Sequence, residues 1–207
     1  ALPIFLASNT STIPIADIAA GAAHPERILG MHFFSPVEKM PLLEVIPHAG
    51  TSAATTAAAV RFGRKIGKTV IVVADHPGFW VNRILTPYLN EAGILLSEGV
   101  PIEVIDRTMT RFGFPVGPVA LLDEGGLDVG QKAAGVMHAA FGARLEPSPV
   151  IGKMLAAKRL GRKSGRGFYL YTDGKKGGAD PGAYTVIGLQ PGQGAAPTMV
   201  EQRRVYA

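Results

Sequence analysis

Apolar and polar positions follow a strand-and-helix pattern over the first 76 residues. Short apolar runs predict strands at residues 3–9, 28–34, 42–46 and 69–74, where β-branched residues are frequent. An Ala-rich stretch predicts a helix over residues 51–66, and a shorter helix is expected over residues 14–23. Strands that alternate with helices in this way are typical of an α/β fold.

The pattern changes to an almost purely helical one after residue 76. Helices are expected at residues 79–97, 102–112, 118–123, 127–141 and 150–157, followed by a lone strand at 168–171. Residues 173–197 are rich in Gly and Pro, and residues 198–207 have the pattern of the first turns of a helix. The sequence therefore predicts an α/β part (1–76), an all-α part (77–172) and a linker with the start of a further helix (173–207).

Composition excludes several kinds of site. The 207 residues are 47% hydrophobic, which is enough for a buried core, and none is Cys, so disulfides, thiolate zinc sites and Cys nucleophiles are excluded. His24, His48, His76 and His138 have no ligand-like spacing with carboxylates, so no metal site is expected. No apolar run reaches the roughly 18 residues that a membrane helix needs, and the first residues do not have the basic region of a signal peptide. We expect a soluble cytoplasmic protein.

The net charge of +5 includes one dense basic cluster within residues 158–166, formed by Lys158, Arg159, Arg162, Lys163 and Arg166. Such a cluster attracts phosphate groups, whether on a nucleic acid or on a cofactor. No nucleic-acid-binding motif surrounds it, so a nucleic-acid partner is not expected, although a basic nucleic-acid-binding domain remains an alternative interpretation.

A candidate general base lies in the stretch MHFFSPVEKMPLLEV, residues 31–45. It reads as a strand, a Pro-containing turn and a second strand, and His32 and Glu44 are twelve positions apart (44 − 32). Two neighbouring strands can bring these side chains together, and a carboxylate that fixes the imidazole tautomer makes histidine an effective base. On the pattern alone, a His between Met31 and Phe33 is more often a core or edge residue.

Five stretches of sequence carry a family resemblance: SNTSTIPI (8–15), GMHFFSPVEKMPLLEV (30–45), DHPGFWVNRILTPYLNEA (75–92), FGFPVGPVALLDEGGLD (112–128) and GRKSGRGFYLY (161–171). In this order and spacing they resemble the L-3-hydroxyacyl-CoA dehydrogenase family, most closely the dehydrogenase part of the α subunit of the bacterial fatty-acid β-oxidation multienzyme complex. The resemblance implies that the chain holds the C-terminal part of a Rossmann-type NAD-binding domain and a helical C-terminal domain.

The resemblance also implies four catalytic positions, which are Ser11, His32, Glu44 and Asn82. Their separations of 21, 12 and 38 residues (32 − 11, 44 − 32, 82 − 44) match the family pattern. In the family reaction a 3-hydroxyacyl-CoA is oxidised to the 3-ketoacyl-CoA in fatty-acid β-oxidation, and NAD takes the hydride. His32 then corresponds to the base and Glu44 to its partner, while Ser11 and Asn82 would hydrogen-bond the reacting oxygen and neighbouring groups.

Cofactor contacts are implied for Ser11, Ser35 and Lys163. Many family members have Asn where this chain has Ser35, and a hydroxyl can still donate and accept a hydrogen bond. No strand–GxGxxG–helix unit occurs in the sequence, so the phosphate-binding turn of a Rossmann domain is absent from it. Both ends have the pattern of cut elements, and we expect the isolated chain to have little or no turnover.

Each of these residues also has a purely structural interpretation. Ser11 can cap the following helix, Glu44 can be a solvated strand residue, and Asn82 can be a packing residue. Lys163 can belong to a solvated basic loop. The four catalytic assignments rest on their joint match, and a non-catalytic helical assembly module remains the alternative function. The resemblance further implies a homo-oligomer formed through the helical domain and a thiolase subunit as a partner of the parent protein.

Overall fold

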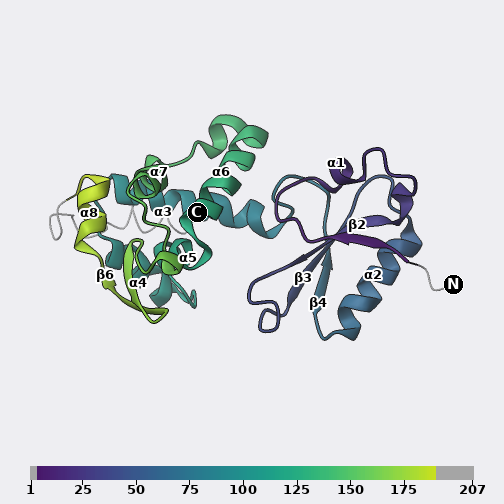
Figure 1. Cartoon of the computed structure of the whole chain (residues 1–207), viewed down its shortest axis with the longest axis horizontal. Coiled ribbons are helices and arrows are strands. Elements are labelled where there is room, and N and C mark those ends of the chain that lie inside the picture. The colour runs from purple at the N-terminus through teal and green to yellow at the C-terminus, as the bar shows by residue number, and fades with distance from the viewer. Residues whose placement is uncertain (1–3, 190–207) are drawn as a thin grey trace. The chain divides into compact units, whose positions relative to one another are not determined.

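The computed structural model describes residues 4–189 and divides the chain into two compact units, Ala1–Ile84 and Leu85–Ala207 (Figure 1). The first unit is α/β and the second is largely helical, as the sequence predicts. The helix expected over residues 198–207 lies outside the described residues. No helix in the described part of the chain is long and apolar enough to cross a membrane.

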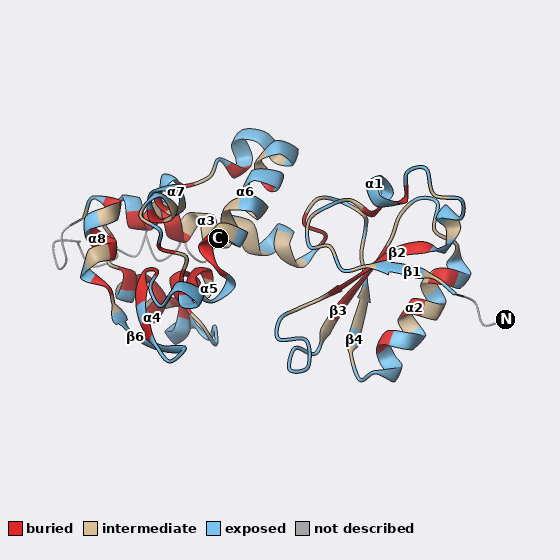
Figure 2. Ribbon diagram, viewed as in Figure 1, coloured by how far each residue is buried: buried red, intermediate tan, exposed pale blue. Residues whose placement is uncertain are grey.

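The first unit is built on a four-stranded sheet. Its strands β1 (Leu6–Ser8), β2 (Ile28–Phe33), β3 (Leu42–Pro47) and β4 (Thr69–Val72) lie side by side in sequence order. β1 and β2 are parallel, as are β3 and β4, whereas β2 and β3 are antiparallel. The two central strands, β2 and β3, are the buried ones (Figure 2). Because β2 and β3 are adjacent and antiparallel, residues from the two halves of the 31–45 stretch face each other.

Alternation along the central strands places two small cores on opposite faces of the sheet. Leu29, Met31, Leu43 and Val45 pack with Ala59 of helix α2 (Ala53–Lys65). The other face carries a cluster of Ile15, Ala19, Ile28, Ile46 and Phe79, to which helix α1 (Ile15–Ala19) contributes. His32 and Glu44 share the strand parity of Ile28 and Ile46, so they point to the α1 face.

Gly30 lets α1 approach that face. A Cβ at Gly30 would lie 2.8 Å from Ile15 Cδ1 and 2.9 Å from Ile46 Cδ1, which is closer than real Cβ contacts. A side chain at this position would therefore force Ile15 and Ile46 to shift. The short predicted helix is thus confirmed, although it covers Ile15–Ala19 and not the whole of residues 14–23.

The second unit packs its helices around a single core. Their bounds are α3 (Val81–Ser97), α4 (Ile102–Phe112), α5 (Pro118–Gly125), α6 (Leu127–Phe141), α7 (Pro149–Ala156) and α8 (Pro181–Ile187), with α3 beginning in the first unit. Short 3₁₀ turns lie at Gly142–Leu145 and Arg162–Ser164 in this unit, and another lies at Pro25–Arg27 in the first unit. Fully buried side chains such as Leu96, Ile102, Met109 and Phe168 form the centre of this core.

The prediction of a lone strand followed by a linker is wrong. Strand β5 (Tyr169–Thr172) pairs with an antiparallel strand β6 (Lys175–Ala179), and α8 follows at once. Ala183, Tyr184 and Ile187 of α8 are buried in the core of the second unit. Residues 173–189 are therefore part of this unit, because a hairpin partner and a buried helix face outweigh their high Gly content.

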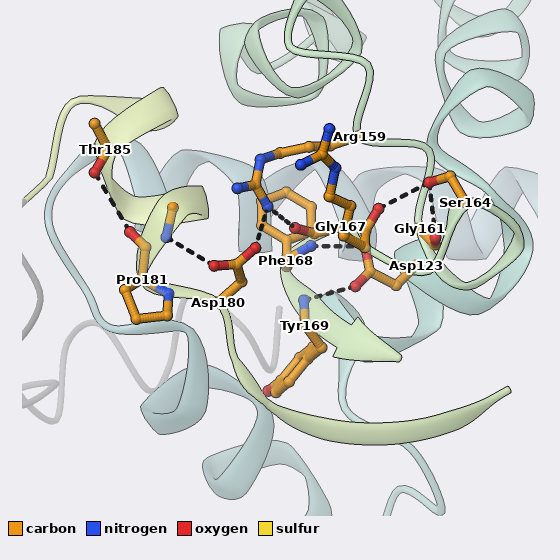
Figure 3. A network of polar contacts seen from close by, with 12 residues as sticks. Asp123, Arg159, Gly161, Ser164, Gly167, Phe168, Tyr169, Asp180, Pro181 and Thr185 are labelled. Atoms are coloured by element: carbon orange, nitrogen blue, oxygen red, sulfur yellow. Dashed lines mark hydrogen bonds and ion pairs between the residues drawn. The ribbon is translucent and has the colours of Figure 1, made fainter. Parts of the chain in front are cut away.

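The dense basic cluster is also not one surface patch. Arg159 is buried, and its NH1 donates to Asp180 Oδ2 (2.5 Å) and to the Gly167 carbonyl (3.0 Å) (Figure 3). Asp180 also accepts from Gly182 N at the start of α8 (2.8 Å). Arg159 thus joins the loop before β5 to the start of α8, and it does not take part in a phosphate-binding surface.

Two buried carboxylates fix helix α5 within the second unit. Asp106 accepts from Val119 N (2.8 Å), Ala120 N (2.9 Å) and the Tyr169 hydroxyl (2.7 Å). Asp123, with no exposed surface, accepts from Phe168 N (3.0 Å) and Tyr169 N (2.9 Å), as Figure 3 shows. One carboxylate therefore caps the first turn of α5, and the other ties its last turn to β5.

The raised pKa of Asp123 should make the stability of the protein depend on pH. Burial raises the pKa of Asp123 to about 6 from 3.8, and the two N–H donors only partly offset that rise. The folded state therefore binds this proton more tightly than the unfolded state. The group's contribution to the free energy of unfolding should fall by about 3 kcal/mol as pH rises from about 4 to about 6.

The measurement is chemical denaturation of the chain across that pH range, with Asp123→Asn as the comparison. The variant cannot titrate at this position, so it should show the smaller loss of stability between about pH 4 and about pH 6. Equal pH slopes for the two proteins would contradict the assignment.

Candidate active site

The predicted pairing of His32 and Glu44 is confirmed. The two residues are direct partners in the β2–β3 register, and His32 Nδ1 lies 2.7 Å from Glu44 Oε2. The side chain of His32 is 5% exposed and that of Glu44 is 0% exposed. With Nδ1 donating to the carboxylate, the neutral imidazole carries its lone pair on Nε2, which is the arrangement a base requires.

The second oxygen of Glu44 is held by the start of helix α3. Glu44 Oε1 accepts from the backbone N–H groups of Trp80 and Val81, both at 3.0 Å. Glu44 thus has three donors, which compensate for burying its charge. Every residue except proline has a backbone N–H group, so this contact could not be recognised from residue types.

Two aromatic rings lie beside the imidazole. The His32 ring centroid is 4.5 Å from that of Phe34 and 5.8 Å from that of Phe79. Phe79 is buried and has a positive φ of 48°, directly after Gly78 at 74°. Since left-handed backbone is costly for a bulky residue, the turn before α3 is held in a strained form that places a ring on His32 and N–H groups on Glu44.

Ser11 and Asn82 are also brought together. Asn82 lies in the first turn of α3, and its Nδ2 donates to the Ser11 carbonyl oxygen (2.9 Å). Ser11 itself is exposed, in the loop between β1 and α1. The side chain of Asn82 therefore holds the backbone of the Ser11 loop.

Two residues that sequence reasoning missed fix the same loop. Asn9 Oδ1 accepts from Phe33 N (2.9 Å), directly beside His32 in β2. Asp75 accepts from Ile15 N (2.7 Å) and Ala16 N (2.8 Å) at the start of α1. Both belong to the quoted stretches, where a polar residue at the end of a strand was the available signal.

The two remaining candidates are Ser35 and Lys163. Ser35 is exposed in the turn after β2. Lys163 belongs to the second unit, where its Nζ forms an ion pair with Asp128 Oδ1 at the start of α6, and this contact lowers the pKa of Asp128. Their cofactor contacts stay predictions.

Two family models match successive parts of the chain. Residues 3–76 match the NAD binding domain of 3-hydroxyacyl-CoA dehydrogenase, and residues 78–171 match its C-terminal domain. Together they cover most of the sequence. The chain belongs to the 3-hydroxyacyl-CoA dehydrogenase family.

Solved structures agree with this membership in the 3-hydroxyacyl-CoA dehydrogenase family. An (S)-3-hydroxybutyryl-CoA dehydrogenase from Ralstonia eutropha is 41% identical, with a TM-score of 0.79 over 84% of this chain and 62% of its own. M. tuberculosis FadB2 is 39% identical, with a TM-score of 0.80 over 83% of this chain and 62% of its own. A 3-hydroxybutyryl-CoA dehydrogenase from Escherichia coli is 37% identical, with a TM-score of 0.76 over 81% of this chain and 36% of its own. The chain thus spans 62% of the length of the first two of these relatives.

NAD is the cofactor of this family, and the residues of this chain fit the nicotinamide end of NAD. β1 and β2 are parallel, so their carboxyl ends, with the Ser11 loop and His32, meet at one edge of the sheet, where open α/β sheets bind ligands. The polar groups there can meet a carboxamide and a hydroxyl. Within residues 4–189, however, β1 leads into α1 through SNTSTIP and not through a glycine-rich turn, so these residues fit the nicotinamide end and not the pyrophosphate.

Proposed function

We propose that this chain supplies the base and the substrate-facing groups for oxidation of (S)-3-hydroxyacyl-CoA to 3-ketoacyl-CoA by NAD. The observation that carries the proposal is the buried His32–Glu44 pair, with Nδ1 and Oε2 at 2.7 Å and the carboxylate anchored on the start of α3. A buried carboxylate that orients an imidazole is the arrangement needed for proton abstraction from an alcohol.

The reaction divides between the cofactor and these side chains. NAD, when bound, accepts the hydride from C3 of the substrate. His32 Nε2 takes the proton of the 3-hydroxyl as the C3 carbonyl forms, and the resulting imidazolium is stabilised by Glu44 through the Nδ1–H bond. Because Glu44 is already held by three donors, the stabilising charge needs no rearrangement during the step.

The remaining assignments concern positioning. Ser11 and Asn82, linked at 2.9 Å, would hydrogen-bond the reacting oxygen and neighbouring groups and align C3 with the nicotinamide. Ser35 and Lys163 would contact the cofactor. Lys163 would leave its ion pair with Asp128 and bind an anionic or carboxamide oxygen of the cofactor instead. We assign the reaction to fatty-acid β-oxidation, and the names of the relatives support a short acyl chain among its substrates.

The test is NADH formation from (S)-3-hydroxybutyryl-CoA. We expect turnover in a polypeptide that contains residues 1–207 together with a complete NAD-binding domain, and little or none in residues 1–207 alone, because the pyrophosphate-binding turn is not among them. The enantiomer (R)-3-hydroxybutyryl-CoA is the control for non-specific reduction of NAD. Absence of turnover in the longer polypeptide would end the proposal, and robust turnover by residues 1–207 alone would overturn the second expectation.

A non-catalytic assembly role remains a second candidate because of an exposed aromatic row on the second unit. Phe112 is 61% exposed and Phe114 39% exposed, and their ring centroids are 6.2 Å apart. Tyr88 stacks on Phe114 at 5.1 Å. Exposed aromatic groups of this kind favour association between protein chains. Sedimentation of the isolated chain tests the assembly role, since a monomer at high concentration would count against it.

A further inference from the structure

We infer that Asp75 is a positioning residue for catalysis, which acts by fixing the loop that carries Ser11 against the elements that hold His32 and Glu44. The inference rests on the proposed function of that pair. Asp75 lies between β4 and α3, and its carboxylate accepts from Ile15 N at 2.7 Å and from Ala16 N at 2.8 Å. It touches neither His32 nor Glu44 in these contacts, so any catalytic effect must pass through the loop.

The start of α1 depends on this distant carboxylate. The residue in the N-cap position is Pro14, whose side chain has no hydrogen-bond acceptor, and it makes no cap bond. A Ser, Thr or Asp at that position would satisfy the first N–H groups of the helix locally. Here the acceptor comes from a residue 60 positions away, so capping the helix also ties the β1–α1 loop to the segment that precedes α3.

Four other hydrogen bonds connect the segments around the proposed base. Asn9 Oδ1 accepts from Phe33 N, which fixes the beginning of the loop beside His32. Asn82 Nδ2 donates to the Ser11 carbonyl, which fixes its middle to the first turn of α3. Trp80 and Val81, in the same segment, donate to Glu44. Asp75 supplies the fixed point at the far end of the loop, so its loss should let Ser11 move while His32 and Glu44 stay paired.

A second helix-capping residue in the same unit serves as a control, because its loss should lower stability without moving the Ser11 loop. Ser52 caps α2 in the same unit by accepting from Thr55 N at 3.1 Å, and none of its described contacts reaches the Ser11 loop. Asp75→Asn and Ser52→Ala should therefore each lower the melting temperature by a few degrees. Asp75→Asn keeps one acceptor oxygen and should fold, whereas Asp75→Ala removes both.

The experiment measures kcat and KM in a polypeptide that contains residues 1–207 together with a complete NAD-binding domain. We expect kcat to fall about 10-fold in Asp75→Asn and about 100-fold in Asp75→Ala, with a much smaller change in KM for the acyl-CoA, because a misplacement near 1 Å costs rates of this order. Ser52→Ala should keep kcat within about 2-fold. A readout without turnover is the fluorescence of Trp80, measured on residues 1–207, in which it is the single tryptophan, and it should change in Asp75→Asn and not in Ser52→Ala.

The outcomes separate the two hypotheses. If His32→Gln inactivates the enzyme but Asp75→Ala keeps the wild-type kcat, the positioning role is wrong and the proposed function stands. If kcat falls equally in Asp75→Asn and Ser52→Ala, the effect is one of stability and the positioning role is likewise wrong. If His32→Gln retains the wild-type rate, the proposed function itself fails.

Discussion

Replacing His32 with glutamine is expected to lower kcat by about 10³- to 10⁴-fold while KM for the acyl-CoA changes little. The reason is that Nε2 is the proposed proton acceptor, and a glutamine amide has no basic nitrogen. The effect should fall on kcat because the proton is transferred in the transition state and not on binding. Steady-state NADH formation, in a polypeptide with a complete NAD-binding domain, measures it.

His32→Asn is the matched control for damage to the fold. Asparagine can place its amide nitrogen near the position of Nδ1 and so keep a donor for Glu44 Oε2, which His32 approaches at 2.7 Å. This variant should be more stable than His32→Gln yet equally inactive, because it keeps the structural contact and lacks the base. Near-normal turnover in either variant would remove His32 from the mechanism.

The core of the site could be predicted from the sequence because it depends on local strand geometry. Two strands around the turn of residues 34–41 place His32 opposite Glu44 in the antiparallel register. Side-chain parity then puts both on one face of the sheet. The proposed role of His32 as base and of Glu44 as its partner rests on their spacing and on the family resemblance, and the 2.7 Å contact between them supports that proposal.

The surroundings of the pair could not be predicted, because they depend on backbone groups and on tertiary distances. The donors to Glu44 Oε1 are the N–H groups of Trp80 and Val81, which any residue could supply. The cap of α1 comes from Asp75 over a separation of 60 residues. Periodicity reports which face of an element is buried, and it carries no information on which distant loop satisfies a helix end.

The errors in the fold have similar causes. The KKGGA run has low strand propensity, and pairing with β5 makes it a strand all the same. Asp180 and Pro181 form a helix-start signal before α8. Because the surrounding residues are rich in Gly, the sequence pattern favours a linker there. The sequence shows Arg159 only as a member of the dense basic cluster. Its partner Asp180 lies 21 positions further on, and the burial of this pair depends on tertiary packing.

Replacing Glu44 with glutamine is expected to lower kcat by about 10³- to 10⁴-fold by reversing the tautomer of His32. The amide has one acceptor, and the two N–H groups of Trp80 and Val81 both point at the Oε1 position. The carbonyl oxygen must therefore occupy that position, which turns the NH₂ toward His32. An NH₂ can only donate, so Nδ1 becomes the acceptor, the proton moves to Nε2, and the base loses its lone pair.

The same geometry separates this effect from loss of stability. Glu44→Gln keeps an acceptor for both backbone donors, whereas Glu44→Ala leaves two part-buried N–H groups without one, at up to about 1–3 kcal/mol for each group. Glu44→Ala should therefore be much the less stable of the two, although both are nearly inactive. Denaturation ranks their stability, and ¹⁵N chemical shifts of the imidazole report the tautomer directly. A Glu44→Gln enzyme within about 10-fold of the wild-type kcat, with Nδ1 still protonated, would show that the carboxylate neither orients nor activates His32.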